Sequence, residues 1–491
     1  MKKLKEIVEY IKDHVIEVIG DVDLNITGIA TDSRKVRKGN IFFALPGTKD
    51  DGKNYISDAI SKGASAVFLE GEVNNIYGVP LVRVREILDV LSKVSSYFYD
   101  FPSKYLNIIG VTGTNGKTTT TNLLYHYWKS KGIRSGLIGT IEYKIDDESY
   151  PSNFTTPQPQ DLQEILRKMV DREVKFLAME ISSHALALKR VDGISLKGAV
   201  FTNLTQDHLD FHKTMEEYFQ AKLKIFNYLE DGGFAVINRD NEWTGRISLP
   251  NRRVFWVSLK NGDLYLKKHE NTNNGMLLEI GTPLGDLIID TKLKGKFNIY
   301  NILFAVGVLI GLGEPLEDIS KFLSTFKGVK GRLELIREGQ NFDVIVDYAH
   351  TPDGLFNVLQ TVKEFTKGRV IVVFGCGGDR DPTKRDKMGE ISARLADIVI
   401  VTSDNPRTED PLKIIRQIEE GIRRVGRSDY FVIENREEAI KKAIEIAGEG
   451  DSVLIAGKGH EDYQIIGNTK IPFSDQEVAK KYILERLKNE S

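Results

Sequence analysis

A short glycine-containing segment, Gly113-Thr-Asn-Gly-Lys-Thr118, follows an apolar stretch at 106–112 and precedes a helical stretch at 119–131. A strand that enters a helix through such a loop is typical of phosphate-binding sites. Glycine lets backbone N–H groups approach phosphate oxygens, and the helix N-terminus adds a favourable dipole. We expect Lys117 to reach the β and γ phosphates and the Thr118 hydroxyl to bind magnesium. The expected phosphate-binding residues are Gly113, Thr114, Asn115, Gly116, Lys117, Thr118 and Thr119.

The spacing of this loop departs from the common G-x-x-x-x-G-K-[ST] pattern. Val111 stands where the first glycine is expected, and Gly110 comes one residue early. A glycine-rich turn from strand to helix, without a ligand, is therefore the alternative interpretation. The shorter form, G-x-x-G-K-T, is itself a distinguishing feature of the chain.

The pattern of apolar stretches predicts an α/β fold. At 491 residues the chain is too long for one hydrophobic core, which favours about three domains. Strands alternate with helices after residue 106, which indicates a parallel sheet, and the alternation restarts after Gly331 as a doubly wound, Rossmann-like unit. This second unit lacks a G-x-G-x-x-G after its first strand, so we do not predict a dinucleotide site there. The predicted domains are 1–102, a small α/β domain, 103–330, a phosphate-loop domain, and 331–491, the Rossmann-like domain.

The strands expected before Gly331 are 106–112, 176–180, 198–203 and 233–238, and those expected after it are 342–347, 369–375, 397–402, 430–434 and 452–456. The strands at 176–180, 198–203 and 233–238 each end in a polar residue, which is where α/β sheets place their chemistry.

Composition excludes several classes of protein. Lysine and arginine (68) nearly balance aspartate and glutamate (70), so no global positive charge favours nucleic-acid binding. No apolar stretch is long enough to span a membrane, and the charged first twelve residues predict an amphipathic helix rather than a secretory signal. The single cysteine, Cys376, excludes an internal disulfide. We expect a cytoplasmic monomer that binds neither membranes nor nucleic acid.

Two further segments carry candidate metal-binding side chains. Glu180 ends a predicted strand, where an acid can hold Mg²⁺, although a solvated loop acid is the alternative. The segment 203–212 places two aspartates and two histidines, among them His208, directly after another strand. That density favours a metal or phosphate site over a chance grouping.

Lys222 lies in the apolar stripe of the next predicted helix. Thr214 to Glu217 is a capping box that fixes the helix start. The stripe consists of Met215, Tyr218, Phe219, Ile225, Phe226 and Leu229. A lysine between these residues either extends outward to solvent, the simpler interpretation, or is paired or modified.

Together these segments resemble the Mur ligase family, whose members build the peptide of the bacterial cell wall. The resemblance rests on the segments 113–119, 179–184, 207–212, 221–222, 295–301, 331–334 and 347–350, in this order. It implies an N-terminal UDP-binding domain, a central ATPase domain and a C-terminal Rossmann-like domain. It also implies ATP and two Mg²⁺, with Glu180, His208 and a carbamylated Lys222 at the metals. The residues that it implies will complete the nucleotide site are Asn298, Asn301, Arg332, Asp347 and His350.

Within the family the chain is most similar to members that add the third amino acid. This similarity implies that Ser33, Thr48, Lys49 and Asp50 bind the UDP-sugar, and that Thr155, Thr156, Ser182 and Arg190 hold the muramyl peptide. Two positions depart from the family pattern. Phe154 stands where an asparagine often occurs, and Leu188 stands where a glutamine is usual.

The segment Asp404-Asn405-Pro406-Arg407 resembles the signature of members that add meso-2,6-diaminopimelate, with Arg380, Gly457 and Glu461 as partners. The resemblance implies ATP-dependent attachment of this diamino acid to a UDP-muramyl dipeptide through an acyl phosphate. A second carboxylate and ammonium on the substrate suit a bidentate arginine and an acid. The alternatives are L- or D-lysine as the amino acid, a folylpolyglutamate-type ligase, and a nucleotide-dependent switch without ligase activity. Asn405-Pro406 alone is also consistent with a simple turn.

Overall fold

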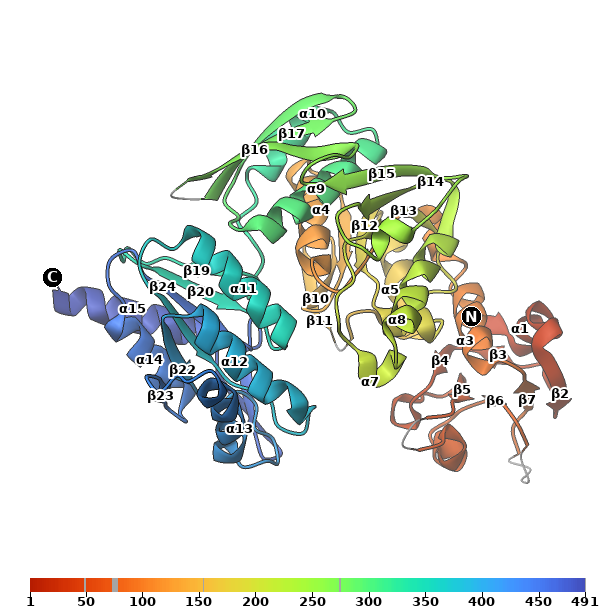
Figure 1. The fold of residues 1–491 in the computed structure, drawn as a ribbon. Helices are drawn as coiled ribbons and strands as arrows, with labels where there is room; N and C mark the ends of the chain where they lie inside the picture. Colours follow the sequence, from red (N-terminus) through yellow and green to blue (C-terminus); the bar gives the residue numbers. More distant parts are fainter. Residues whose placement is uncertain (48–49, 73–77, 153, 273–274, 491) are drawn as a thin grey trace. The chain divides into compact units, whose positions relative to one another are not determined.

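The computed structural model describes residues 1–47, 50–72, 78–152, 154–272 and 275–490. The chain forms two compact units. The first contains Met1–Leu264 and Leu303–Pro315, and the second contains Tyr265–Ile302 and Leu316–Ser491. Figure 1 shows helices covering sheets within each unit.

The N-terminal part of the first unit is a five-stranded sheet of order β2-β7-β6-β5-β4. Apolar side chains of α1 and α3 pack on one face, and α2 packs on the other. The predicted first helix is confirmed. The chain changes sheets at Thr27: β3 pairs with β1, and β4 pairs with β5. The bounds are β1 Lys2–Lys3, α1 Leu4–Tyr10, β2 Val15–Ile19, β3 Asn25–Ile26, β4 Gly28–Ala30, β5 Asn40–Ala44, α2 Ile56–Ser61, β6 Ala66–Leu69, β7 Leu81–Val84 and α3 Ile87–Phe98.

The rest of the first unit is built on strands in the order β11-β10-β9-β12-β8-β13-β14-β15. The strands from β9 to β15 in this order run parallel, as predicted, and β10 and β11 form an antiparallel extension. The strands are β8 Asn107–Thr112, β9 Ser135–Ile138, β10 Glu142–Ile145, β11 Glu148–Pro151, β12 Phe176–Glu180, β13 Leu196–Phe201, β14 Leu229–Asn238 and β15 Arg253–Ser258. The helices are α4 Lys117–Ser130, α5 Pro159–Asp171, α6 Ser183–Ala187, α7 Leu209–His212 and α8 Met215–Leu223.

The register of this parallel sheet brings the predicted site segments together. Glu180 at the end of β12 lies opposite Val111 of β8, and Phe201 at the end of β13 lies opposite Thr112. The carboxyl ends of parallel strands meet at one edge of a sheet. The glycine loop, Glu180 and the segment after Phe201 therefore lie side by side.

The second unit combines an antiparallel β16-β17-β18 arrangement with a six-stranded sheet of order β19-β20-β24-β21-β22-β23. Apolar residues of α11, α12 and α13 cover one face of the latter sheet, and those of α14 and α15 cover the other. The predicted doubly wound unit is thus confirmed. The strands are β16 Leu264–Thr272, β17 Gly275–Thr282, β18 Gly285–Thr291, β19 Glu334–Ile336, β20 Asp343–Asp347, β21 Val370–Phe374, β22 Ile398–Val401, β23 Phe431–Val432, β24 Ser452–Ala456, β25 Tyr463–Ile466 and β26 Thr469–Pro472. The helices of this unit are α10 Leu316–Leu323, α11 Pro352–Phe365, α12 Arg385–Leu395, α13 Pro411–Arg424, α14 Arg436–Ile446 and α15 Asp475–Glu490. Helix α9, Lys296–Gly311, begins in this unit, and its residues from Leu303 onward belong to the first.

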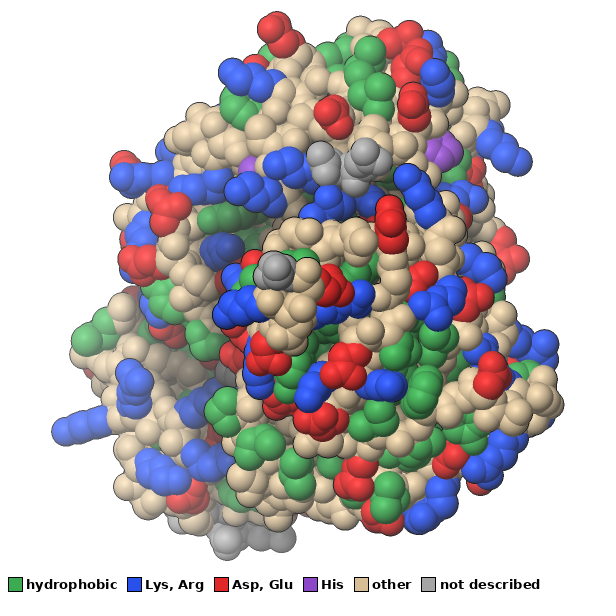
Figure 2. Space-filling model, turned by 90° about the vertical axis from the view of Figure 1, so that its left-hand side faces the viewer, with side chains coloured by type: hydrophobic (Ala, Val, Ile, Leu, Met, Phe, Trp, Pro, Cys, Tyr) green, Lys and Arg blue, Asp and Glu red, His purple; other side chains and the backbone are tan. Residues whose placement is uncertain are grey.

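Two observations concern the surface. On the face drawn in Figure 2, basic and acidic side chains are interspersed, in keeping with the near-neutral net charge. In the part of the chain that the structure describes, no helix is both long and apolar enough to cross a bilayer.

Candidate active site

The glycine loop has the backbone conformation that its sequence requires. Gly116, with a φ of +90°, caps α4, and Gly113 has a φ of +141°. A Cβ at Gly113 would come within 1.9 Å of Thr202 Oγ1, so no other residue fits there. The Asn115 N–H donates to Asn203 Oδ1 at 2.9 Å. The loop is therefore held against the segment that follows β13.

Two lysine side chains donate to the same backbone carbonyl in this loop. Lys117 Nζ lies 2.9 Å from the carbonyl oxygens of Gly113 and Thr114. Lys222 Nζ also lies 2.9 Å from the Gly113 oxygen. Burial, and secondly the positive charge of Lys117, lower the pKa of Lys222 well below its ordinary value, while Asp207 opposes this shift. Both effects favour the neutral amine of Lys222 over its ammonium form.

Lys222 points inward, against the simpler interpretation of its sequence position. Its side chain is 1% exposed, and its Nζ lies 4.7 Å from the centre of the Tyr218 ring. Thr214 caps α8 by accepting from the Glu217 N–H, as predicted. The predicted continuation of the helix to Leu229 is wrong, since α8 ends at Leu223, a 3-10 turn covers Lys224–Tyr228 and β14 begins at Leu229. Apolar residues three or four apart fit both helix types, so the sequence pattern does not distinguish them.

Glu180 is buried and its carboxylate is oriented by a residue that the sequence interpretation missed. Thr140 donates from its backbone N–H to Glu180 Oε1 and from its hydroxyl to Oε2, both at 3.0 Å. The Thr140 hydroxyl also lies 3.1 Å from that of Thr155. Thr140 follows the end of β9, which neighbours β12. A polar residue just after an apolar strand was the signal that could have identified it.

His208 lies in a group of aromatic side chains beside the loop. Its ring is edge-on to that of His184, and the two ring centres lie 4.9 Å apart. The centre of the Tyr218 ring lies 6.1 Å from that of His208. The Tyr218 hydroxyl is within 3.2 Å of Thr114 Oγ1. Nε2 of His208 is 3.4 Å from Asp207 Oδ2. His208 is thus brought near the loop, and through Tyr218 near Lys222.

Residues predicted to hold a peptide surround the end of β12. The buried Thr156 hydroxyl donates to the Glu180 carbonyl at 2.9 Å and accepts from the Ser182 N–H at 3.0 Å. Ser182 caps α6 by accepting from the Ala185 N–H. Arg190 donates to the Thr156 carbonyl at 3.2 Å. The predicted residues Thr155, Thr156, Ser182 and Arg190 therefore form one cluster.

The two departures from the family pattern have different effects. Phe154 places its ring 5.2 Å from the Arg190 guanidinium, so a cation–π contact occupies this position. Burial lowers the pKa of Arg190, and its Nε lacks a hydrogen-bond partner among the described residues. Such a guanidinium is suited to an anion. Leu188 follows α6 and has no polar side-chain group to offer a substrate.

In the N-terminal domain the structure describes two of the four predicted sugar-binding residues. Ser33 is buried at the start of a 3-10 turn, and its hydroxyl hydrogen-bonds to Asp58. Asp50 accepts from the Tyr55 hydroxyl and, at 2.9 Å, from Asn54 Nδ2. Thr48 and Lys49 lie outside the described residues.

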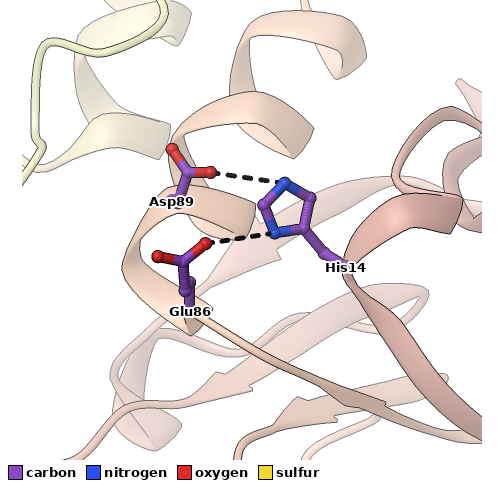
Figure 3. A group of neighbouring side chains, drawn as sticks. All are labelled: His14, Glu86 and Asp89. Carbon is purple, nitrogen blue, oxygen red and sulfur yellow. Dashed lines mark ion pairs between the residues drawn. The ribbon is translucent and has the colours of Figure 1, made fainter.

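A separate histidine and acid group lies in the same domain (Figure 3). His14 Nε2 is 3.4 Å from Asp89 Oδ2, and Nδ1 is 3.8 Å from Glu86 Oε2. The ligand atoms of these three residues lie within 4.8 Å of one another. However, Lys93 Nζ is 2.7 Å from His14 Nε2 and 3.0 Å from Asp89. The lysine ammonium already supplies the positive charge, so we do not assign a metal there.

The predicted nucleotide-binding residues of the second unit form two groups. Asn301 Nδ2 donates to Asn298 Oδ1 at 3.0 Å within α9, and both side chains are buried. Asp347 accepts from the N–H groups of Leu333 and Ala349, and burial raises its pKa although Arg332 opposes the shift. The rings of His350 and Tyr348 lie 4.6 Å apart, and Arg332 lies over Tyr348. Arg332, Asp347 and His350 are therefore brought together.

The remaining predicted residues meet at the carboxyl ends of β21, β22 and β24, and we call them the Arg407 cluster. They are Arg380, Asp404, Asn405, Pro406, Arg407, Gly457 and Glu461. A Cβ at Gly377 would lie 3.0 Å from Arg407 Nη1 and 3.8 Å from Arg380 Cγ, so both arginines flank this glycine. Arg407 donates to the backbone carbonyl of Gly378 at 2.7 Å, and Arg380 donates to that of Asp379 at 3.2 Å. Among the described residues neither arginine has a carboxylate partner.

Asp404 and Glu461 form the acidic side of the Arg407 cluster, and beside them lies a lysine that the sequence interpretation missed. Lys458 is fully buried, with Nζ 3.1 Å from Asn405 Oδ1, 3.1 Å from Glu461 Oε2 and 3.5 Å from Asp404 Oδ1. Asn405 Nδ2 donates to Glu461 Oε2 at 3.0 Å. A lysine in a glycine-rich loop directly after an apolar strand was the available signal.

Comparisons with known proteins agree with this arrangement. The chain matches a Mur ligase family catalytic domain at residues 25–99, a Mur ligase middle domain at 111–309 and a Mur ligase glutamate ligase domain at 331–459. It is 47% identical to the UDP-N-acetylmuramoyl-L-alanyl-D-glutamate–2,6-diaminopimelate ligase of Bacillus velezensis, over 94% of this chain and 95% of that one. It is 45% identical to the ligase of the same name from Geobacillus kaustophilus, over 94% of this chain and 96% of that one.

Structural comparison gives the same result. A solved structure of a ligase of this name matches with a TM-score of 0.70 and 32% identity, covering 99% of each chain. The three-domain α/β architecture expected from the sequence is confirmed by these relatives, while the exact boundaries at 102 and 330 stay a prediction. The chain belongs to the Mur ligase family.

Proposed function

We propose that the chain uses ATP to join meso-2,6-diaminopimelate to the D-glutamyl side-chain carboxylate of UDP-N-acetylmuramoyl-L-alanyl-D-glutamate. Family membership and the names of the relatives support the reaction class. One observation supports the amino acid. Arg380 and Arg407 lack a carboxylate partner among the described residues, yet Asp404 and Glu461 lie in the same cluster. A zwitterionic end group matches this separation of charge.

The proposed chemistry has two steps. First, a carboxylate oxygen of the D-glutamyl side chain attacks the γ-phosphorus of ATP, the bond to the β–γ bridging oxygen breaks, and ADP leaves. Next, the amine of the diamino acid attacks the acyl carbon of the acyl phosphate. The C–O bond to phosphate breaks, inorganic phosphate leaves and the nitrogen loses a proton. Positioning and charge neutralisation supply most of the catalysis in such transfers.

The loop residues take up the phosphate charge in this proposal. The backbone N–H groups of residues 113–119 approach the phosphate oxygens, and Lys117 turns its ammonium from the Gly113 carbonyl to the β and γ phosphates. Asn298, Asn301, Arg332, Asp347 and His350 bind the rest of the nucleotide. Thr155, Thr156, Ser182 and Arg190 hold the muramyl peptide. Because ATP and nucleotide-linked sugars are cytoplasmic metabolites, we place the reaction in the cytoplasm.

We further propose that Lys222 is carbamylated. Only an unprotonated amine attacks CO₂, and the lowered pKa of Lys222 supports this state. Its nitrogen forms a bond to the CO₂ carbon and loses a proton, which yields a carbamate anion. The anion removes the repulsion from Lys117 and supplies carboxylate-like oxygens in a buried position.

The donor set for a second magnesium ion is complete only after this modification. Glu180 offers a buried carboxylate that Thr140 orients, and Thr118 offers a hydroxyl, both suited to a hard cation. The unmodified Lys222 amine offers no anionic oxygen. We propose that Thr118 and Glu180 hold one Mg²⁺, and that His208 and carbamylated Lys222 hold a second. When bound, the ions neutralise phosphate charge.

The decisive experiment measures release of inorganic phosphate from ATP in the presence of the UDP-muramyl dipeptide. We expect meso-2,6-diaminopimelate to support turnover far better than L-lysine, D-lysine or L-ornithine, because these diamines lack the second carboxylate. Faster turnover with lysine would refute the assignment of the amino acid. ATP hydrolysis that ignores both the dipeptide and amino acids would indicate a switch instead. Turnover with a folate substrate would indicate the folylpolyglutamate-type reaction.

A variant tests the phosphate role of the loop. Lys117→Ala removes the ammonium that is proposed to reach the transferred phosphate. We expect turnover to fall by about a thousandfold while the far-ultraviolet circular dichroism stays unchanged. Near-normal amide formation in this variant would contradict the role.

A further inference from the structure

Lys458 lies beneath the side chains proposed to bind the end group of the diamino acid. We propose that Lys458 is a positioning residue that makes the Arg407 cluster selective for a zwitterionic end group over a lone ammonium. This inference rests on the proposed function and adds to it a specific source of selectivity. Its basis is a closed hydrogen-bond network of the described residues and the charge that this network carries.

The hydrogen bonds of Lys458 fix the side chains of Asn405 and Glu461. Lys458 Nζ donates to Asn405 Oδ1 and Glu461 Oε2, each at 3.1 Å. Asn405 Nδ2 donates to the same Glu461 oxygen at 3.0 Å, and the Ile465 N–H donates to Asn405 Oδ1 at 2.9 Å. Glu461 Oε2 and Asn405 Oδ1 therefore each accept two hydrogen bonds. Glu461 is held in one orientation, with Oε1 left to accept from a substrate ammonium.

Lys458 is held in place as firmly as the side chains that it positions. Its side chain is 0% exposed, and one residue separates it from the end of β24. The glycine before it, Gly457, has a φ of +119°, which lets the loop turn beside Asp404. The ammonium has no exit to solvent, so its charge stays beneath the cluster.

The charge of Lys458 changes what the acidic side of the cluster attracts. Asp404 and Glu461 are the two carboxylates within 3.5 Å of its ammonium, and the lysine cancels one of their two negative charges. Beneath them Arg436 is paired with Asp475 and adds no net charge. One uncancelled negative charge matches one substrate ammonium. Arg380 and Arg407 then require a carboxylate on the same substrate end.

Without Lys458 the acidic side would carry two uncancelled charges. It would attract a substrate end that has only an ammonium more strongly, and it would lose the orientation of Glu461 and Asn405. Lysine as substrate should then compete better with meso-2,6-diaminopimelate. Selectivity would fall for an electrostatic reason, since the arginines are unchanged.

The test compares kinetic constants of the full-length enzyme and its variants. In Lys458→Met we expect the KM for meso-2,6-diaminopimelate to rise by about tenfold or more, as loss of a charged hydrogen-bond partner implies. The kcat should stay within about twofold, because Lys458 touches no reacting atom. The KM values for ATP and the UDP-muramyl dipeptide should not change. The kcat/KM ratio of diaminopimelate to L-lysine should fall.

Two further variants separate charge from geometry and keep the test informative if Lys458→Met does not fold. Lys458→Gln keeps a donor for Asn405 but removes the charge, so it should lose selectivity. The double variant Lys458→Met with Glu461→Gln leaves Asp404 as the one charged acid. It should regain much of the selectivity ratio while its KM for diaminopimelate stays high. Lys470→Met, which changes an exposed lysine 3.6 Å from the Tyr463 ring centre, is the matched control and should behave like the wild type.

Three results would overturn the inference. An unchanged selectivity ratio in Lys458→Gln would remove the electrostatic argument. A ratio in the double variant as low as in Lys458→Gln would do the same. A parallel fall in kcat for both amino acids, or a rise in all three KM values, would reduce Lys458 to general structural support. Failure of the proposed function is distinguishable, because then the wild type itself shows no diaminopimelate-dependent phosphate release.

Discussion

Lys222 in the first unit and Lys458 in the second are both buried, yet their surroundings are opposite. Lys222 donates to one backbone carbonyl, which Lys117 shares. Lys458 has two carboxylates and an amide oxygen within 3.5 Å. Burial penalises the charged form of an amine unless a negative charge compensates. The surroundings of Lys222 therefore favour the proposed carbamylation, whereas those of Lys458 offer an ammonium two carboxylates as partners.

This difference shows that burial alone does not define the function of a lysine. The two residues have nearly equal exposure, and the hydrogen-bond partners distinguish them. A lysine without a counter-charge gains from losing its proton, whereas a lysine between acids gains from keeping it.

The largest effect is expected at Lys222. Lys222→Met should lower turnover by about a thousandfold, because no carbamate can form. Wild-type turnover should fall in CO₂-depleted buffer and recover with bicarbonate, while the variant should not respond. Since only the neutral amine reacts, carbamylation should be lost as the pH falls through the lowered pKa of Lys222.

Carbon-13 NMR in labelled bicarbonate measures the modification directly. The carbamate signal should persist in Lys458→Gln and disappear in Lys222→Met. Lys224→Met, an exposed lysine two residues away, is the control and should keep the signal. A carbamate at Lys458 would contradict the contrast between the two lysines.

The second effect concerns stability at Lys458. Lys458→Met removes the cation between Asp404 and Glu461, so the free energy of unfolding should fall by about 3 kcal/mol or more. Denaturant unfolding monitored by far-ultraviolet circular dichroism measures the change. Adding Glu461→Gln should restore part of the loss. An unchanged free energy of unfolding would show that the buried charge network contributes little to the fold.

The third effect concerns Arg407, which lacks the kind of partner that Lys458 has. Arg407→Met should raise the KM for meso-2,6-diaminopimelate by about ten- to a hundredfold and change lysine use little. Steady-state kinetics with both amino acids provide the measurement. Arg416→Met, at an exposed arginine on α13, is the control. Equal losses with both amino acids would argue against a carboxylate at Arg407.

The smallest effect concerns the paired arginine beside the cluster. Arg385 binds Glu409 through two nitrogens, and this side-chain pair lowers the pKa of Glu409 to about 2. A carboxylate whose pKa is lowered in the folded state stabilises the fold at pH values above its pKa in the unfolded state. This contribution is lost as the pH falls toward the pKa in the folded state. Solvent screening limits the effect to about 1 kcal/mol.

Thermal unfolding between neutral pH and about pH 3 measures this contribution. Glu409→Gln should remove the corresponding part of the acid sensitivity and leave the rest of the profile unchanged. The same slope in both proteins would show that the pair adds no pH-dependent stability.

The parallel sheets could be predicted from the sequence because each buried strand is a run of apolar residues. β12 has the predicted bounds, 176–180, and the strands of the Rossmann-like sheet occur where expected. Sequence reasoning did not identify Thr140 or Lys458, because their importance comes from neighbours distant in sequence. Thr140 meets Glu180 only through the pairing of β9 with β12, and Lys458 meets Asn405 only after the loops assemble. The spacing of residues along the chain does not reveal contacts between segments that are distant in sequence.

The shared carbonyl of Gly113 also links the protonation of Lys222 to the binding of an anion at the loop. Lys117 and Lys222 donate to the same oxygen, so the proton affinity of one depends on the position of the other. Any anion that draws Lys117 away relieves the repulsion felt by Lys222. By reciprocity, the charge on Lys222 alters the affinity of the loop for that anion by the same free energy. Anion binding at the loop and protonation of the buried amine are therefore coupled rather than independent.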